Sequence, residues 1–143
     1  MKVLVDTNIW LDLLLDRQPF SVMSHAALAA CINDEDDICI APTSLKDVFY
    51  LVRKKLDAKH AYEAIELILN MTEVLVIDRI ICEKAIQLER PDYEDGMIAA
   101  IALTEKADCI LTRDEGAFTE LSIPKYSPTE FLKAQGYEKI DFD

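Results

Sequence analysis

Four aspartates stand at comparable places in the chain, each beside a predicted strand end or helix start. Asp6 and Asp114 directly follow apolar runs that are typical of buried strands, and Asp47 and Asp95 fall in the predicted first turns of two helices. Clustered carboxylates raise each other's pKa unless a cation lies between them. Because oxygen ligands without His or Cys suit Mg²⁺ or Mn²⁺, these residues predict a divalent metal site.

A metal site of this kind binds phosphate oxygens and activates a water molecule, so no side chain has to act as the nucleophile. The chain carries 15 Lys and Arg against 27 Asp and Glu, a net charge of −12. That charge alone argues against nucleic-acid binding, because phosphate contacts need cations. Bound metal would offset part of it locally, and Arg53, Lys54 and Arg113 are then the candidates to hold a nucleic-acid backbone.

Strand and helix patterns alternate along the sequence and place these residues. The expected strands cover residues 2–6, 38–41, 74–77 and 108–112, with a short edge strand near 125–126. The expected helices cover residues 8–15, 21–33, 45–56, 59–69, 79–88, 93–107 and 128–134. This alternation predicts a parallel α/β sheet with helices on both faces. Since parallel strands share one carboxyl edge, the four aspartates are expected to converge there.

Two of the aspartates also have an ordinary structural explanation at helix starts. Ser44 is the expected N-cap of the helix at 45–56, which puts Asp47 at its capping-box position. Asp92 is expected to cap the helix at 93–107, with Asp95 at position N3. First-turn acids stabilise a helix by roughly 0.3–1 kcal/mol each. Taken singly, each acid is explained as well by this role as by a metal site.

Length and composition point to one domain spanning residues 1–143, with 51% hydrophobic residues. The four cysteines lie far apart without a CxxC pair, which is typical of reduced core cysteines and not of a zinc site. Acids interrupt the N-terminal apolar run, so a signal peptide is not expected, and no run approaches the roughly 18 apolar residues of a membrane span. We expect a cytoplasmic protein without membrane contact.

Four segments resemble the PIN domain family, which includes bacterial VapC-type ribonucleases, the toxins of toxin–antitoxin pairs. They are VDTNIWLD, PTSLKDVFYLVRK, DYEDGMIAAIA, and CILTRDEGAF followed by SPTEFL. They contain the four aspartates in order and cover nearly the whole chain, so the resemblance is specific. It implies a three-layer α/β/α sandwich with a central, mostly parallel sheet of four to five strands.

The resemblance also implies a function and a set of site residues. It implies a Mg²⁺- or Mn²⁺-dependent endoribonuclease that hydrolyses RNA phosphodiester bonds as a homodimer, with an antitoxin protein as the partner if it is a toxin. The implied metal ligands are Asp6, Asp47 and Asp95, completed by Asp114. The implied supporting residues are Thr7 and Asn8, which position the first acid or the water. Asp92 is expected to cap its helix first and to support the site second.

Two departures from the family pattern keep a second hypothesis open. Asp47 stands where the family often has Glu, and Ala117 stands where many members carry another Asp. Both fit a non-catalytic PIN-like module with a decayed metal site that acts through protein or RNA binding. A phosphatase or receiver domain is disfavoured, because the former requires a second Asp at position 8 and the latter paired acids after the first strand, where Thr7 and Asn8 stand instead.

Overall fold

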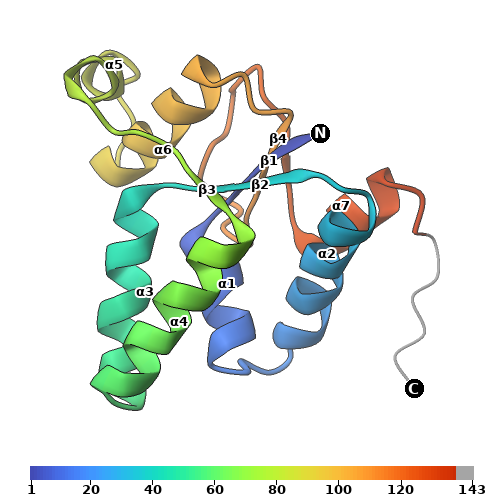
Figure 1. Ribbon diagram of the computed structural model, residues 1–143. Coiled ribbons are helices and arrows are strands. Elements are labelled where there is room, and N and C mark those ends of the chain that lie inside the picture. Colours follow the sequence, from blue (N-terminus) through green and yellow to red (C-terminus); the bar gives the residue numbers. More distant parts are fainter. Residues whose placement is uncertain (138–143) are drawn as a thin grey trace.

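The computed structural model describes residues 1–137 and contains a five-stranded sheet between two layers of helices (Figure 1). The strands pair in the order β3-β2-β1-β4-β5, and all four pairings are parallel. The expected three-layer α/β/α architecture is therefore confirmed. The strands are β1 (Lys2–Val5), β2 (Asp37–Ile40), β3 (Glu73–Val74), β4 (Cys109–Leu111) and β5 (Lys125–Tyr126).

The helices divide unequally between the two faces of the sheet. Figure 1 shows α5 and α6 above the sheet and the other helices below it. The upper layer consists of α5 (Arg79–Gln87) and α6 (Tyr93–Thr104). The lower layer consists of α1 (Thr7–Leu14), α2 (Ser21–Asn33), α3 (Pro42–Lys55), α4 (Ala58–Met71) and α7 (Pro128–Ala134).

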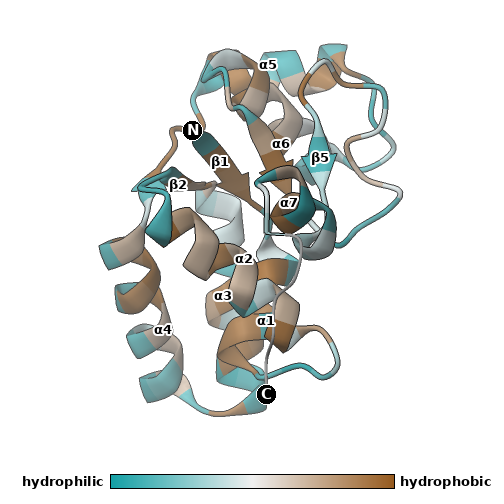
Figure 2. Cartoon of the chain, turned by 90° about the vertical axis from the view of Figure 1, so that its right-hand side faces the viewer, coloured by the Kyte–Doolittle hydropathy of each residue, from teal (hydrophilic) through white to brown (hydrophobic). Residues whose placement is uncertain are grey.

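Residues of the central strands alternate between two hydrophobic clusters, one on each face. In β1, Val3 and Val5 pack toward the lower helices, whereas Leu4 packs toward α5 and α6. Successive side chains of a strand point to opposite faces, so a strand covered on both sides needs apolar residues throughout. This explains the unbroken apolar runs, which appear as brown strands between the helices in Figure 2.

The strand order creates a topological switch point between β1 and β4. From β1 the chain proceeds to β2 and β3 on one side, and then crosses back to β4 and β5 on the other. Ligand sites of open α/β sheets form in the crevice beyond the carboxyl ends of such strands. The amide of Asp6 donates to the Leu111 carbonyl at 2.9 Å, so the first acid is fixed against the end of β4.

Helix α3 begins three residues earlier than expected, which corrects the roles of Ser44 and Asp47. Its N-cap is Ala41, whose side chain makes no capping bond, and Pro42 occupies the first turn. Proline lacks an N–H and already has a helical φ, so it favours a helix start here as well as a strand end. Ser44 is therefore not the cap, and Asp47 lies in the second turn, one turn further along the helix than predicted.

Strand β3 is also shorter than the predicted residues 74–77. It pairs with Cys39 and Ile40 of β2, and the Leu75 amide makes the last bond, to the Ile40 carbonyl at 2.9 Å. Because β2 stops where α3 starts, residues beyond 75 have no strand beside them to pair with. The helices predicted at 21–33 and 128–134 and the edge strand at 125–126 have the predicted bounds. Within residues 1–137, every helix is too short or too polar to cross a bilayer.

Candidate active site

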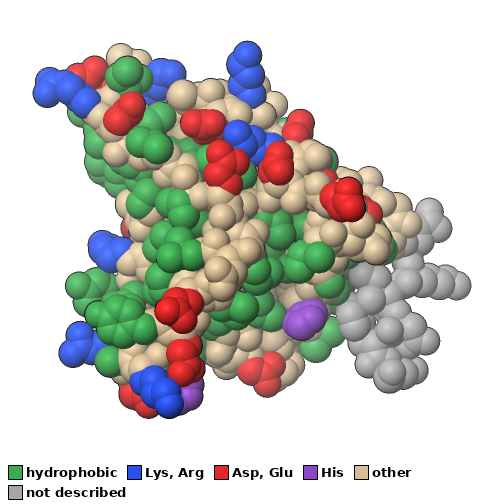
Figure 3. Space-filling model, in the orientation of Figure 1, with side chains coloured by type: hydrophobic (Ala, Val, Ile, Leu, Met, Phe, Trp, Pro, Cys, Tyr) green, Lys and Arg blue, Asp and Glu red, His purple; other side chains and the backbone are tan. Residues whose placement is uncertain are grey.

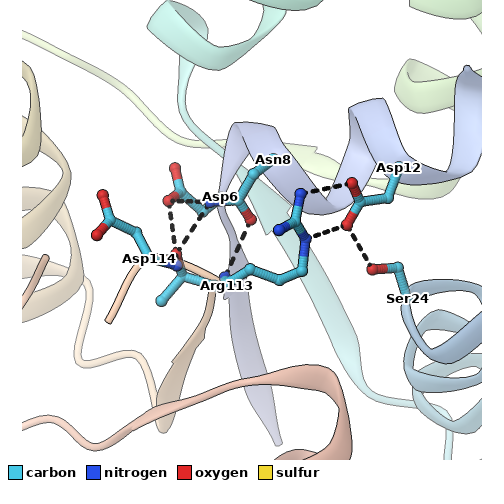
Figure 4. A network of polar contacts seen from close by, with 7 residues as sticks. Asp6, Asn8, Asp12, Ser24, Arg113 and Asp114 are labelled. Atoms are coloured by element: carbon cyan, nitrogen blue, oxygen red, sulfur yellow. Dashed lines mark hydrogen bonds and ion pairs between the residues drawn. The ribbon is translucent and has the colours of Figure 1, made fainter. Parts of the chain in front are cut away.

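Asp6 lies at the centre of the carboxyl edge, where Figure 4 shows it beside Asn8, and its carboxylate accepts three hydrogen bonds. The Thr7 amide donates to Oδ1 at 2.8 Å, the Thr112 hydroxyl to Oδ2 at 2.8 Å, and the Asn8 amide group to Oδ2 at 3.3 Å. The residue is only 8% exposed. Burial raises the pKa of Asp6, and the bonds from Thr112 and Thr7 oppose that shift. The orientation of this carboxylate is therefore set before any ligand binds.

Thr112 joins the ends of β1 and β4, a role that the sequence analysis missed. Besides donating to Asp6, its buried hydroxyl accepts from the amide of Asp114 at 3.1 Å and from Asn8 at 3.3 Å. Ser44 plays a similar part on α3, because the Thr7 hydroxyl donates to its Oγ at 2.8 Å. The signal for Thr112 was available, since it is the first polar residue after the apolar run of β4.

Asp95, in the first turn of α6, shares an electrostatic environment with three other acids. Burial and the charge of Asp92, followed by the charges of Asp6 and Asp114, raise its pKa to about 6, while Arg90 opposes the shift. The predicted capping role of Asp92 is confirmed, because its Oδ1 accepts from the Glu94 amide at 2.8 Å and from the Asp95 amide at 3.3 Å. Side chains from β1, β4 and α6 therefore meet at one edge.

Asp47 of α3 and Glu94 of α6 lie close enough to interact. Burial, a hydrogen bond with Asp47 and the charges of Asp47 and Asp92 together raise the pKa of Glu94 to about 7. Asp47 also adds to the upward pKa shift of Asp6, which ties it to the central acid. Lys46 lies beside this pair, with its Nζ 3.8 Å from Oδ1 of Asp47. Lys46 was missed because the sequence does not show which lysines of a helix face a site.

The donor set fits a divalent cation, although it is not closed into a coordination sphere. Within residues 1–137, no three Asp, Glu, His or Cys side chains are grouped closely enough to form a ready-made metal site. The charges of the carboxylates nevertheless raise the pKa values of their neighbours. A cation bound between them would offset this repulsion. All the donors are hard oxygen atoms, as Mg²⁺ and Mn²⁺ prefer.

Asp114 lies on the exposed rim, and Ala117 does not face the carboxylates. Oδ1 of Asp114 accepts from the Gly116 amide at 3.0 Å. Ala117 is 4% exposed and packs with Phe118 into the hydrophobic cluster beneath α6. Lys125 stabilises the loop at residues 114–117, because its Nζ donates to the carbonyls of Ala117 at 2.7 Å and Asp114 at 3.2 Å. In this conformation, the side chain at position 117 belongs to the core.

Arg113 has a structural partner in Asp12, which is completely buried in α1 (Figure 4). One Nη of Arg113 donates to Oδ1 of Asp12 at 2.7 Å, Nε donates to Oδ2, and the Ser24 hydroxyl donates to Oδ2 at 2.9 Å. The guanidinium also lies 3.8 Å from the centre of the Phe20 ring. Such a bidentate pair leaves little of the guanidinium for a phosphate, and it anchors the end of β4 to α1 and α2.

The other two predicted backbone contacts, Arg53 and Lys54, lie exposed near the C-terminal end of α3. They are seven and eight residues beyond Lys46, so all three lie on one side of the helix. In Figure 3, Lys and Arg side chains alternate with hydrophobic ones along the edge of the molecule where α3 runs. A row of cations therefore leads away from Asp47.

The sequence profile of the PIN domain family matches residues 2–116, a stretch that contains all four aspartates. The chain belongs to the PIN domain family. Among curated proteins, Ribonuclease VapC1 of Aquifex aeolicus is 26% identical over 123 residues, 82% of this chain and 85% of that protein. PIN membership and the parallel sheet agree with what the four sequence segments implied.

Solved structures similar to this PIN domain share its fold at low sequence identity. VapBC2 of Rickettsia felis, bound to a promoter DNA fragment, has a TM-score of 0.70 at 17% identity and covers 89% of this chain and 100% of its own. A toxin–antitoxin complex from Klebsiella pneumoniae has a TM-score of 0.70 at 21% identity, and the match covers 88% of this chain and 97% of that one. VapC20 of Mycobacterium tuberculosis, described as a toxin that cleaves the sarcin–ricin loop, has a TM-score of 0.68 at 14% identity. The match covers 79% of this chain and 90% of that one.

Proposed function

We propose that this PIN domain is a Mg²⁺- or Mn²⁺-dependent endoribonuclease of the cytoplasm that hydrolyses RNA phosphodiester bonds. The observation that carries the proposal is the convergence on Asp95. Burial and the charge of Asp92 raise its pKa most, and the charges of Asp6, directly after β1, and Asp114, beyond β4, raise it further. Such convergence is unnecessary for helix capping, and Asp92 already caps α6. The similarity to a protein named Ribonuclease VapC1 supports RNA as the substrate.

Asp6, Asp47 and Asp95 would hold the cation, with Asp114 completing the set from the rim. A divalent cation supplies charge to the phosphate oxygens and lowers the pKa of a water molecule. The Thr112 hydroxyl, the Thr7 amide and the Asn8 side chain hold Asp6 in position, and the bonds from Thr112 and Thr7 favour its ionised form against the effect of burial. The raised pKa of Glu94 allows it to accept or release a proton near neutral pH.

The backbone of the RNA would follow α3. Lys46 stands beside Asp47, and Arg53 and Lys54 continue the row about 10–12 Å further along the helix, at 1.5 Å per residue. Arg113 enters the proposal as a positioning residue, because Asp12 binds its guanidinium. Exposed cations of this kind hold phosphates without reading the bases.

The partner of the domain would be an antitoxin protein, with a homodimer as the assembly. Several structures with this fold are complexes of a toxin with its antitoxin, which supports such a partner. The family resemblance is the support for the homodimer. Co-expression with the product of a small adjacent reading frame, followed by size-exclusion chromatography with light scattering, tests both the partner and the copy number.

The decisive experiment is cleavage of single-stranded RNA with Mg²⁺ or Mn²⁺ by the wild type and by the Asp6→Asn and Asp95→Asn variants. We expect each substitution to lower the rate roughly 100-fold or more, because each removes a charged ligand. Asp37→Asn is the matched control, since Asp37 begins β2 at the opposite edge of the sheet. Unchanged cleavage by Asp6→Asn and Asp95→Asn would refute the site.

A non-catalytic PIN module is the second candidate, favoured by the absence of a ready-made ligand group in residues 1–137. Titration calorimetry with Mn²⁺ separates the two functions. A catalytic site should bind Mn²⁺ at up to millimolar concentration and lose that binding in Asp6→Asn. A domain that does not bind metal and does not cleave RNA would act through protein or RNA binding alone.

A further inference from the structure

A cavity of about 640 Å³ opens beside the carboxylate site, between the segment that precedes α2 and the segment that leads into α7. Its walls include Thr112 and Asp114, so it is continuous with the carboxyl edge where the acids meet. Cavities of roughly 300–1,000 Å³ are typical of small-molecule and cofactor sites. Its volume is therefore sufficient for a nucleoside, and its position makes it a neighbour of any phosphate bound at Asp114.

Phe20 and Arg113 both line the cavity and stack on each other, and we call this stacked pair the platform. Phe20 is 43% exposed, and the guanidinium of Arg113 lies 3.8 Å from the centre of its ring. The buried carboxylate of Asp12 holds that guanidinium by two bonds, so the platform is fixed from behind. Bases of single-stranded RNA stack on aromatic rings and on the planes of arginine side chains.

The charges around the cavity favour a neutral base over a phosphate. Asp114, Glu115 and Glu130 line it. The two cations that line it are already engaged, Arg113 by Asp12 and Lys125 by backbone carbonyls of the loop at 114–117. A phosphate would be repelled by these carboxylates, whereas a base that presents N–H donors would find acceptors.

We propose that this cavity receives one nucleobase of the RNA next to the cleaved phosphate, stacked on Phe20 with its N–H donors toward the carboxylate rim. The inference rests on the proposed function, because it takes the neighbouring carboxylates as the place of cleavage. It adds a determinant of base preference that lies outside the four aspartates and outside the cation row of α3. The ligand class is a base with an amino or imino group.

The first test measures base binding without cleavage. The Phe20→Trp variant places a fluorescent ring in the platform, whereas Trp10 of the wild type is fully buried and serves as the background. We expect saturable quenching by at least one of the four ribonucleosides, measured without metal, and none by ribose, which lacks a base. Equal effects of nucleoside and ribose, or no quenching at all, would overturn the proposal.

The second test uses an inactive background so that the RNA stays intact. In Asp6→Asn, adding Phe20→Ala or Phe20→Leu should weaken binding of a single-stranded oligoribonucleotide roughly 5- to 100-fold, the usual effect of losing one stacked base. Phe20→Leu keeps apolar volume at the site and guards against misfolding. Tyr62→Ala is the matched control, because Tyr62 is 65% exposed on α4, away from the cavity. Equal affinities of the Phe20 and Tyr62 variants would contradict the proposal.

The two proposals fail in different ways. A wild type that cleaves RNA while Phe20→Trp shows no base-dependent quenching would overturn the base cavity and leave the nuclease assignment intact. A wild type that never cleaves, in spite of base-dependent quenching, would overturn the nuclease assignment. In that case the cavity would be a nucleotide site of a non-catalytic module.

Discussion

At the scale of single residues, the site depends on hydrogen bonds that fix carboxylates in place. Asp6 is buried and charged, which is costly unless donors surround it. Thr112 supplies the shortest of its side-chain donors and at the same time receives the amide of Asp114. The hydroxyl therefore orients two acids at once, from a residue that is not itself a metal ligand.

Thr112→Val tests this role with almost no change of shape. We expect RNA cleavage to fall roughly 10- to 100-fold, as for other residues that orient metal ligands, with a parallel loss of Mn²⁺ affinity. Thr112→Ser should recover most of both, because it restores the hydroxyl. Kinetics and calorimetry on the two variants provide the measurement. Equal losses in both variants would indicate a packing role for the side chain.

Asp12 gives a stability prediction at the same scale. Asp12→Ala leaves Arg113 without its partner, and breaking a buried pair in this way costs about 3–5 kcal/mol. We expect the lower end of that range, because the Arg113 side chain is 23% exposed. Removing both charges in Asp12→Leu with Arg113→Met should cost less than Asp12→Ala alone. The free energy of unfolding in urea is the measurement. A double variant that is less stable than Asp12→Ala would contradict the argument.

At the scale of elements, the start of α6 carries two acids to the sheet edge. Asp92 caps α6 and so points the first turn of that helix, with Glu94 and Asp95, toward Asp6. Gly96 follows, where an added Cβ would lie 3.3 Å from the Ala85 carbonyl of α5. The glycine thus permits the close approach of α5 and α6. Helix α7 borders the base cavity and begins with a complete capping box of Ser127 and Glu130.

The capping box gives a prediction with a pH dependence. Bonds from the Ser127 amide and hydroxyl lower the pKa of Glu130, so this carboxylate stabilises the fold above its unfolded pKa. That contribution is lost as the pH falls through the lower, folded pKa. Ser127→Ala should cost about 1 kcal/mol near neutral pH and less in acid. Unfolding measured at several pH values tests this, and a cost that grows as the pH falls would be the wrong sign.

At the scale of the whole molecule, an acidic chain concentrates carboxylates at one edge of the sheet, with the Lys and Arg side chains of α3 beside them. The net charge of −12 opposes RNA binding in general. The site can overcome this only locally, through Lys46 and the α3 cations and through a bound metal. The same concentration of charge makes stability depend on pH and on metal.

For the metal-free protein we predict a loss of stability as the pH rises from about 4 to about 7. The folded pKa values of Asp95 and Glu94, about 6 and about 7, exceed those of ordinary unfolded carboxyls, so the folded state binds more protons in this window. The free energy of unfolding must then decrease as the pH increases. Mn²⁺ or Mg²⁺ favours the ionised forms and should raise the melting temperature more at pH 7 than at pH 5.

Thermal unfolding across this range, with and without metal, provides the measurement. Asp95→Asn and Glu94→Gln should flatten the metal-free profile, because they remove the groups that take up protons on folding. Asp37→Asn is a useful comparison, since Asp37 begins β2 at the opposite edge of the sheet and its loss should leave this slope in place. A wild-type stability that rises between pH 4 and 7 would contradict the arrangement of acids.

The sequence by itself determined the layers of the fold, and it supplied the four aspartates of the proposed site. Alternation of buried strands and amphipathic helices is local information. It sufficed for the parallel α/β sheet and for helix bounds to within two residues, except at the start of α3 and the end of α6. Asp6 and Asp114 were found because each follows an apolar run, a pattern visible without any contact. The errors arose where local signals conflict, as at Pro42, which suits both the end of β2 and the start of α3.

Only the tertiary structure decided which side chains surround those acids. The order β3-β2-β1-β4-β5 places β4 beside β1, and this brings Thr112 to Asp6 across 106 residues. It also pairs Arg113 with Asp12, faces Glu94 toward Asp47, and turns Ala117 into the core. These contacts depend on strand order and on helix rotation. Both result from packing over long sequence separations, which no local pattern encodes.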